Sequence, residues 1–430
     1  MKKLLFLLSL VVGMASCSNE DLELADNAIQ EQNQQASFKV SPEEAKTELG
    51  DFLEQLNSSD TKTRSIGQLE IADVFPIRKG VHTRAASSDE PGSEDVEIDT
   101  LMYAINFLDN RGFALVAADK RTTPILAVID EGSFSVDSLQ EGTDEGFLSF
   151  VDDAIQMELK DIEEYEDKPV SRTLITNGYT INSYYKPILH TRWTQDGVYG
   201  KYCPNSIAGC AIIATAQILS HFQTIGQVNW SYNGTGGSAI LHWDRIISDC
   251  DKHSGRLTSS DCYTSGDEIA HLVRYLGIAL GADYKKGSTG CGESKAIDWF
   301  NKWGGLKASK LKDYNETNIV NAIKGGNPVY ARGNSGKKKV LGIRVGWKGG
   351  HAWVYDGMLT ASKDNKTSTF IHCNWGWNGR NNGYYISKAF NTNAGAIIYD
   401  NAGDYQASGT SNYKYHLQSL LSNKSWLIGL

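Results

Sequence analysis

The sequence has no excess of basic residues and no basic segment of useful length. Its 42 Lys and Arg residues are outnumbered by 51 Asp and Glu residues, and the net charge is -9 at pH 7. The basic cluster from Lys337 to Lys339 is short. Because nucleic acids and anionic membrane surfaces are bound through clustered Lys and Arg, we expect no nucleic-acid partner.

Cysteine and histidine patterns typical of metal sites are also absent. The chain has 7 Cys and 9 His, but it contains no C-x-x-C motif and no pair of histidines at the spacing of zinc ligands. We therefore expect no metal and no cofactor. Cys250 and Cys262 close a short loop and are the best candidates for a disulfide if the chain is exported, although spacing does not fix the pairing.

The sequence opens with an apolar run that is too short to span a bilayer. Met1, Lys2 and Lys3 precede the run from Leu4 to Val12, a pattern typical of a secretory signal. Small residues then precede Cys17, as in a bacterial lipobox, where the cysteine is lipidated and becomes the mature N-terminus.

We interpret residues 1–16 as a signal peptide and residues 17–38, which are polar, as a flexible tether lipidated at Cys17. An ordinary cleavage site is the alternative. The sequence thus predicts an exported protein at the cell envelope, on the outer membrane or the cell surface, or one released after processing. Its membrane contact would be made only through the lipid.

The first folded segment has the pattern of a small α+β domain. Ser41, Pro42 and Glu44 are typical of the start of a capped helix, which we expect to end near Ser58. Short apolar runs predict strands at 69–77, 102–107, 113–118 and 125–129. A second helix follows, with apolar residues at helical spacing from Leu148 to Ile162. The pattern ends at 168, so we divide the chain into domains at 39–168 and 169–430.

The second domain has helices first and strands afterwards. The patterns predict helices at 209–222, 266–280, 293–303 and 316–324. They predict strands at 329–332, 340–345, 351–358, 369–373 and 383–387. This order indicates an α+β domain with a helical half and an antiparallel sheet half, and the cleft between the halves is a natural site.

Cys210 begins the helix that has almost no polar face. The N-terminus of a helix presents unpaired N–H groups and the positive end of the helix dipole, which favour a thiolate over a thiol. A thiolate is the attacking species in cysteine chemistry. The alternative is that Cys210 is a small buried apolar residue, as most unpaired cysteines are.

Residues elsewhere in the sequence complete a nucleophilic set with Cys210. His351 lies 141 residues later and Asn374 a further 23, in the order and approximate spacing of papain-like proteases. A histidine can serve as base and acid, and an Asn carbonyl can fix its tautomer. Trp375 can shield that hydrogen bond from water. Gln195 and the Cys210 N–H can hold an oxyanion.

Several motifs resemble the streptopain family of papain-like cysteine peptidases. They are Gly209-Cys210-Ala211, Ala214-Thr215-Ala216-Gln217-Ile218, Gly350-His351-Ala352, Asp356-Gly357 and Asn374-Trp375-Gly376-Trp377. The resemblance covers about residues 180–390. It implies a papain-like catalytic domain at 169–430 and an inhibitory prodomain at 39–168, which blocks the cleft and displaces the catalytic histidine.

The resemblance also implies roles for individual residues. Cys210 resembles the nucleophile, His351 the base and Gln195 the oxyanion-hole glutamine, while Asn374 and Trp375 resemble the pair that orients and shields the histidine. We therefore expect a cysteine endopeptidase zymogen that acts on peptide or protein substrates. The alternatives are a surface lipoprotein that binds glycans or peptides without catalysis, suggested by 10 Trp and 20 Tyr, and a thioester-forming acyltransferase on the same fold.

Overall fold

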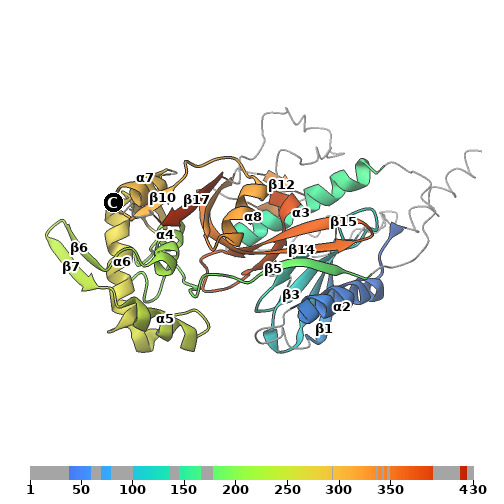
Figure 1. Cartoon of the computed structure of the whole chain (residues 1–430), viewed down its shortest axis with the longest axis horizontal. Helices are drawn as coiled ribbons and strands as arrows, with labels where there is room; N and C mark the ends of the chain where they lie inside the picture. The colour runs from blue at the N-terminus through green and yellow to red at the C-terminus, as the bar shows by residue number, and fades with distance from the viewer. Residues whose placement is uncertain are drawn as a thin grey trace, which may run out of the picture. The chain divides into compact units, whose positions relative to one another are not determined.

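Figure 1 shows the computed structural model of the chain. The structure describes residues 38–59, 69–78, 100–135, 145–165, 178–292, 294–335, 338–340, 343–345, 349–390 and 417–423. The expected signal peptide, Cys17 and nearly all of the expected tether lie outside these residues, as does the expected domain boundary after residue 168. From Val40 onward the chain forms one compact unit.

The N-terminal part of this unit is a four-stranded meander with two helices. Its elements are α2 (Pro42–Ser59), β1 (Ile71–Arg78), β2 (Thr100–Phe107), η1 (Leu108–Asn110), β3 (Phe113–Ala117), β4 (Ile125–Ile129) and α3 (Glu145–Glu163). At the start of α2, the Glu44 N–H donates to Ser41 Oγ at 3.2 Å and the Ser41 N–H donates to Glu44 Oε2 at 2.8 Å. The expected capping box is confirmed, and each expected strand and helix of this part is present.

In the second part, the described residues form five further α-helices and most of the remaining strands. The helices are α4 (Cys210–Phe222), α5 (Trp243–Lys252), α6 (Ser265–Ala279), α7 (Lys295–Lys302) and α8 (Glu316–Lys324), with the short η3 (Ser259–Asp261) and η4 (Ser387–Phe390). The main strands are β5 (Thr180–Tyr185), β10 (Leu306–Ala308), β11 (Val329–Ser335), β14 (Gly349–Lys363), β15 (Lys366–Asn374), β16 (Gly383–Ile386) and β17 (Leu417–Asn423). The α+β fold expected for the chain is confirmed.

Three short hairpins complete the described structure. They pair β6 (Gln227–Tyr232) with β7 (Thr235–Ile240), β8 (Asp283–Lys285) with β9 (Ser288–Gly290), and β12 (Lys338–Val340) with β13 (Ile343–Val345). The single strand expected at 340–345 is therefore wrong. Gly342 gives the run no side chain to pack at its centre, a feature more typical of a break than of a strand interior. Helix α5 and the β6–β7 hairpin are additional elements that are not among those expected from the sequence.

One sheet runs through both parts of the compact unit. Its strand order is β1-β2-β3-β4-β16-β15-β14-β11-β17-β10, with β5 paired to β14. Strand β4 of the N-terminal part pairs antiparallel with β16, with Gly383 opposite Ile129 and Tyr385 opposite Ala127. A Cβ atom on Gly383 would lie 2.4 Å from the Val128 carbonyl oxygen. Glycine is therefore what allows the two backbones to approach here.

Two hydrophobic cores lie on the two faces of strand β14. Ala352 and Val354 belong to the core built by α4, α5, α6 and α7, which we call the helical core. Trp353 and Tyr355 belong to the core shared with α2, α3 and β1 to β4, which we call the shared core. Figure 1 shows α5 and α6 grouped well away from α2 and α3. Successive residues of a strand point to opposite faces, so residues 352–355 of β14 enter the two cores alternately.

The disulfide expected between Cys250 and Cys262 is absent, and the six described cysteines are all reduced. Cys250 lies fully buried on α5, and its sulfur accepts a hydrogen bond of 3.4 Å from the Trp193 indole. Burial raises the pKa of Cys250 to about 12, which keeps the thiol protonated. None of the helices that the structure describes is long and apolar enough to cross a bilayer.

The contact between α3 and the second part predicts that a methyl group added at Gly146 destabilises the fold. A Cβ on Gly146 of α3 would lie 2.2 Å from Cε3 of the Trp375 indole. We expect Gly146→Ala to lower the free energy of unfolding of the full chain by about 2 kcal/mol, because overpacking forces a rigid ring or a helix to move. Urea unfolding followed by fluorescence measures this change.

Gly50→Ala is the matched control for this prediction. Gly50 is an exposed residue of α2, and a Cβ atom added to it would have no neighbouring atom within 4 Å. Alanine in a helix interior is favoured over glycine by roughly 0.5–1 kcal/mol, so this variant should be slightly more stable than the parent. Equal stability of the two variants would contradict the packing of α3 on Trp375.

Candidate active site

Cys210 is the first residue of α4, and the turn before it requires glycine. Gly209 has a φ of 97°, and a Cβ there would lie 3.0 Å from the Thr289 carbonyl oxygen. The expected burial of this helix is confirmed, since every residue from Ala211 to Ser220 is buried. Cys210 itself is half-buried and packs against the helical core. The sulfur therefore sits at the positive end of a buried helix.

Gln195 lies beside the start of the same helix. Its backbone carbonyl accepts a hydrogen bond of 2.6 Å from the N–H of Ala208, two residues before Cys210. The Gln195 side chain is buried. The structure thus brings the expected oxyanion-hole segment and the expected nucleophile together.

Asn374, at the end of β15, is joined to α4 through Gln217. Asn374 Oδ1 accepts a hydrogen bond of 3.3 Å from Gln217 Nε2, and Asn374 Nδ2 donates to the Thr191 carbonyl at 2.7 Å. Gln217 Oε1 accepts from the Trp193 N–H at 2.9 Å. These side chains are almost fully buried. Asn374 therefore faces α4 and the loop that carries Gln195.

His351 lies among aromatic rings rather than beside Cys210 or Asn374. Its imidazole stacks between Trp353 and Trp377, with ring centroids 5.9 Å from each and interplanar angles of 14° and 13°. Its Nε2 donates to the Trp375 backbone carbonyl at 2.9 Å. Because a carbonyl oxygen can only accept, this contact requires a hydrogen on Nε2.

The alternation of β14 assigns His351 and Cys210 to different cores. His351 contacts Trp353 and Trp375, which belong to the shared core, whereas Cys210 packs against the helical core. The two cores lie on opposite faces of the strand. The structure therefore brings Cys210, Gln195 and Asn374 to one side of β14 and holds His351 on the other.

Trp375 is buried under the N-terminal part of the chain. Its indole packs on Gly146 of α3 and against Trp353, whose ring centroid is 5.0 Å away. The indole N–H donates to the Tyr385 hydroxyl at 3.2 Å. In this arrangement Trp375 covers His351 through its backbone carbonyl and ring, and the hydrogen bond between His351 and Asn374 is not formed.

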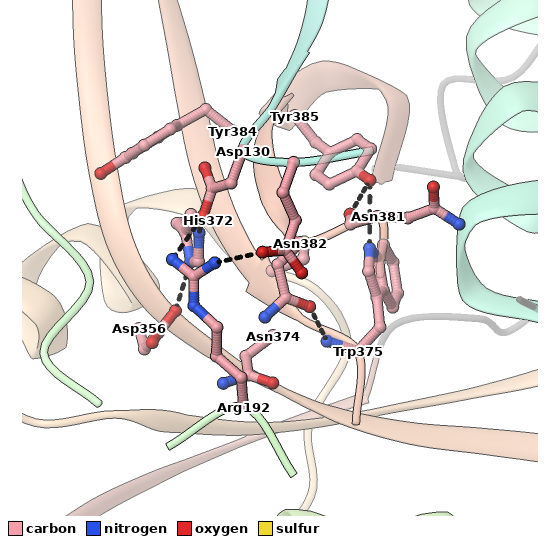
Figure 2. Close-up of polar contacts among 12 residues, drawn as sticks. Asp130, Arg192, Asp356, His372, Asn374, Trp375, Asn381, Asn382, Tyr384 and Tyr385 are labelled. Carbon is pink, nitrogen blue, oxygen red and sulfur yellow. Dashed lines mark hydrogen bonds and ion pairs between the residues drawn. The ribbon is translucent and has the colours of Figure 1, made fainter. Parts of the chain in front are cut away.

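A partly buried charge network joins the N-terminal part to the second part near this site (Figure 2). Asp130, which follows β4, pairs through Oδ2 with Arg192 at 3.1 Å and with His372 Nε2 at 3.2 Å. The other ring nitrogen of His372 meets Asp356 Oδ1 at 2.5 Å. His372 thus lies between two carboxylates, one from each part. We call Asp130, Glu131, Arg192, Asp356 and His372 together the carboxylate latch.

Glu131 adds a second pair of contacts to the latch. Its carboxylate lies 3.5 Å from Arg192 Nη1 and also pairs with Arg256. The Arg256 Nε donates to the Asn378 carbonyl at 2.9 Å, so the guanidinium is held in place by the second part. Two consecutive carboxylates of the N-terminal part therefore meet two arginines and a histidine of the second part.

The charges of the latch shift the pKa values of its members. Burial alone would lower the pKa of His372, but the carboxylates of Asp356 and Asp130 outweigh burial and raise this pKa from 6.5 to about 9. Burial opposes ionisation of Asp130, but His372 and Arg192 lower its pKa below the usual 3.8. At neutral pH His372 is therefore protonated and pairs with the ionised carboxylate of Asp130.

Sequence reasoning missed Gln217, His372 and the latch as functional features. Gln217 appeared only within a helix motif. His372 lies two residues before Asn374 on the same strand, and period-two alternation places both on one face, which was the available signal. Asp130 and Glu131 carried no signal, because their partners lie far away in sequence. Among the described residues, no three side chains of His, Cys, Asp or Glu lie together as metal ligands would.

Comparisons with known proteins match both parts of the chain. The sequence model of the Peptidase C10 family matches residues 193–385, and that of the Spi protease inhibitor matches residues 36–155. Streptopain of Streptococcus pyogenes is 23% identical over 355 residues, which cover 70% of this chain and 80% of streptopain. Streptopain of another serotype of that species is 23% identical over 356 residues.

A solved structure is also similar to this chain. It is a mutant fragment of prointerpain A from Prevotella intermedia, with 20% identity and a TM-score of 0.48 over 76% of this chain and 96% of the fragment. The two family matches divide the chain in the same order as the expected prodomain and catalytic domain. The chain belongs to the streptopain family and is a cysteine endopeptidase made as a zymogen with an inhibitor-type prodomain.

Proposed function

We propose that this chain is an exported endopeptidase, anchored through a lipid on Cys17, in which Cys210 is the nucleophile and His351 the base. The observation that carries the proposal is the arrangement around α4. Cys210 begins the helix, the Gln195 segment is bonded to the residues just before it, and Asn374 is bonded to Gln217 farther along. Three of the groups that acyl transfer needs are thus anchored to one helix.

In the proposed reaction, the Cys210 thiolate attacks the carbonyl carbon of a peptide bond. The Gln195 amide and the Cys210 N–H stabilise the oxyanion, and the imidazolium of His351 gives its proton to the leaving amine. Neutral His351 then takes a proton from the water that attacks the thioester, and the thiolate leaves. Asn374 orients the imidazole, and Trp375 shields their hydrogen bond from water.

The zymogen is idle because His351 has its ring on the wrong face of β14. Activation requires the imidazole to leave the stack between Trp353 and Trp377 and to reach the face that carries Asn374. Gly349 and Gly350 precede His351, and glycine backbones rotate with little steric restriction. A change confined to the start of the strand is enough, because a shift of one residue reverses the face of every side chain involved.

The prodomain, which we place at residues 39–168, holds this inactive arrangement through two kinds of contact. Gly146 of α3 packs on the Trp375 ring, whose backbone carbonyl accepts the His351 hydrogen bond. Strand β4 pairs with β16, and the carboxylate latch fixes the end of β4 on Arg192 and His372. Removal of the prodomain would free both Trp375 and the edge of β16.

The test of the proposed function is the loss of the thiol. We expect Cys210→Ala to abolish both self-processing and cleavage of casein, because in the proposed reaction the Cys210 sulfur forms the thioester. Gel analysis over time and release of soluble peptides measure the two activities. Cys262→Ala is the control, because Cys262 lies after η3 and outside the described site, and this variant should keep its activity. A Cys210→Ala enzyme with parental activity would refute the mechanism.

The latch predicts a pH dependence of zymogen stability. Because the folded chain raises the pKa of His372 from 6.5 to about 9, its proton stabilises the fold fully below 6.5, and this contribution is lost as the pH rises through about 9. A shift of this size corresponds to a few kcal/mol. We expect the inert Cys210→Ala zymogen to unfold at lower urea concentration at pH 9 than at pH 7.

Two histidine variants of that zymogen separate the latch from general effects of pH. In His372→Gln, the difference between pH 7 and pH 9 should shrink markedly. His190→Gln removes an exposed histidine that pairs with Asp251, and its pH dependence should match that of the parent. Equal pH dependence in all three proteins would show that the latch does not take up a proton at His372.

The proposed anchor is tested by the partition of the protein between detergent and water. We expect the chain expressed with its own leader in a Gram-negative host to enter the detergent phase of Triton X-114. Cys17→Ser should move it to the aqueous phase, because a serine cannot receive the thioether-linked lipid. Aqueous partition of the parent, or detergent partition of both proteins, would contradict lipidation at Cys17.

A further inference from the structure

We propose that Gln217 is a positioning residue of the active site, which holds the Asn374 amide with its oxygen toward the catalytic histidine. The inference rests on the proposed function, and it assigns a role to a residue that does not itself touch the substrate. Gln217 is 0% exposed on α4, and both polar atoms of its side chain are hydrogen-bonded. A buried amide is costly unless its hydrogen bonds are made, and here they join two separate parts of the site.

The direction of the hydrogen-bond chain through Gln217 is fixed by backbone groups at both ends. At one end, the Trp193 N–H can only donate, so the Gln217 atom that faces it must be the carbonyl oxygen. The Gln217 NH2 group must then face Asn374 and donate to Oδ1. At the other end, the Thr191 carbonyl can only accept, so it must face the Asn374 NH2 group. The orientations of the Gln217 and Asn374 amide groups are therefore both determined by these backbone partners.

Because the direction of the hydrogen bonds is fixed, the Asn374 oxygen remains available to accept a hydrogen bond from the catalytic histidine. A carbonyl oxygen has two lone pairs, and Gln217 occupies one of them. The second can accept an N–H from the imidazole of His351 after activation. If the Asn374 amide turned over, it would present a donor to that N–H, and the imidazolium would lose its acceptor.

The same side chain also ties the oxyanion segment to the nucleophile helix. Gln217 holds the backbone of Trp193, two residues before Gln195. Cys210 and Gln217 are seven residues apart, close to two full helical turns, and therefore lie on one face of α4. Through Gln217, a single helix face sets the nucleophile, the histidine partner and the oxyanion donor relative to one another.

Two substitutions of the full-length zymogen test this role after activation by added wild-type enzyme. Gln217→Met preserves the length of the side chain and removes both hydrogen bonds. We expect kcat to fall about 10- to 100-fold at every pH, because a small misplacement of a catalytic group costs up to about 100-fold in rate, with KM changed by less than about threefold. Thr215→Val is the control, because the buried Thr215 hydroxyl donates only within α4, to the Ala211 carbonyl; its kcat should stay near the parental value.

Gln217→Glu supplies a readout that a purely structural role would not give. A neutral carboxyl group can accept from Trp193 and donate to Asn374, as glutamine does, whereas a carboxylate can only accept. We expect kcat of Gln217→Glu to approach the parental value at acidic pH and to fall toward that of Gln217→Met as the pH rises and the carboxyl ionises. Circular dichroism of each variant establishes that it is folded.

The possible outcomes separate this inference from the proposed function. If the activated parent cleaves casein but Gln217→Met keeps a kcat within about twofold of Thr215→Val, the positioning role is wrong. It is also wrong if Gln217→Glu and Gln217→Met have the same kcat at every pH. If the activated parent itself does not cleave peptide bonds, the proposed function fails, whatever the variants do.

Discussion

The alternation of side chains along β14 is the constraint on which the inactive state depends. Ala352 and Val354 fill the helical core, while Trp353 and Tyr355 fill the shared core. As long as this register holds, His351 follows Trp353 into the shared core and away from Cys210. Slipping the whole strand would turn two large aromatic side chains into the helical core, so the register is strongly specified. In the proposed mechanism, the packing that stabilises the fold is therefore also what keeps His351 away from Cys210.

The N-terminal part stabilises this state mainly through apolar contact, and the latch gives that contact its register. The shared core contains residues of α2, α3 and β1 to β4 together with those of β14 to β16. Burying a charge costs free energy that its partners often only offset, so the ion pairs of the latch add little net stability. Asp130 and Glu131 meet Arg192, Arg256 and His372 only when β4 is aligned on β16 as observed. Mispaired registers would leave these partly buried charges without partners.

The sequence predicted local structure well and distant contacts poorly, for physical reasons. The capping box of α2 and the buried helix that begins at Cys210 depend on residues close together in the chain, and both are confirmed. The stacking of His351 on Trp377 depends on where β14 ends relative to the turn after β15, which periodicity does not specify. The latch joins residues 130 and 372, and no local pattern relates them. The prediction of a disulfide at Cys250 was wrong for a similar reason. The length of the loop between two cysteines does not specify which core a helix face packs into.

In the zymogen most of the proposed site is assembled, and His351 is the member that is out of place. The chain from Trp193 through Gln217 and Asn374 to Thr191 is complete, and its groups are buried and bonded in the only direction that the backbone allows. Preorganised donors and acceptors reduce the reorganisation that a reaction must carry out. If the whole site had to form during activation, its many hydrogen bonds would have to be made at once. Confining the change to His351 leaves a small, local rearrangement, and this is compatible with a prodomain that acts on one face of one strand.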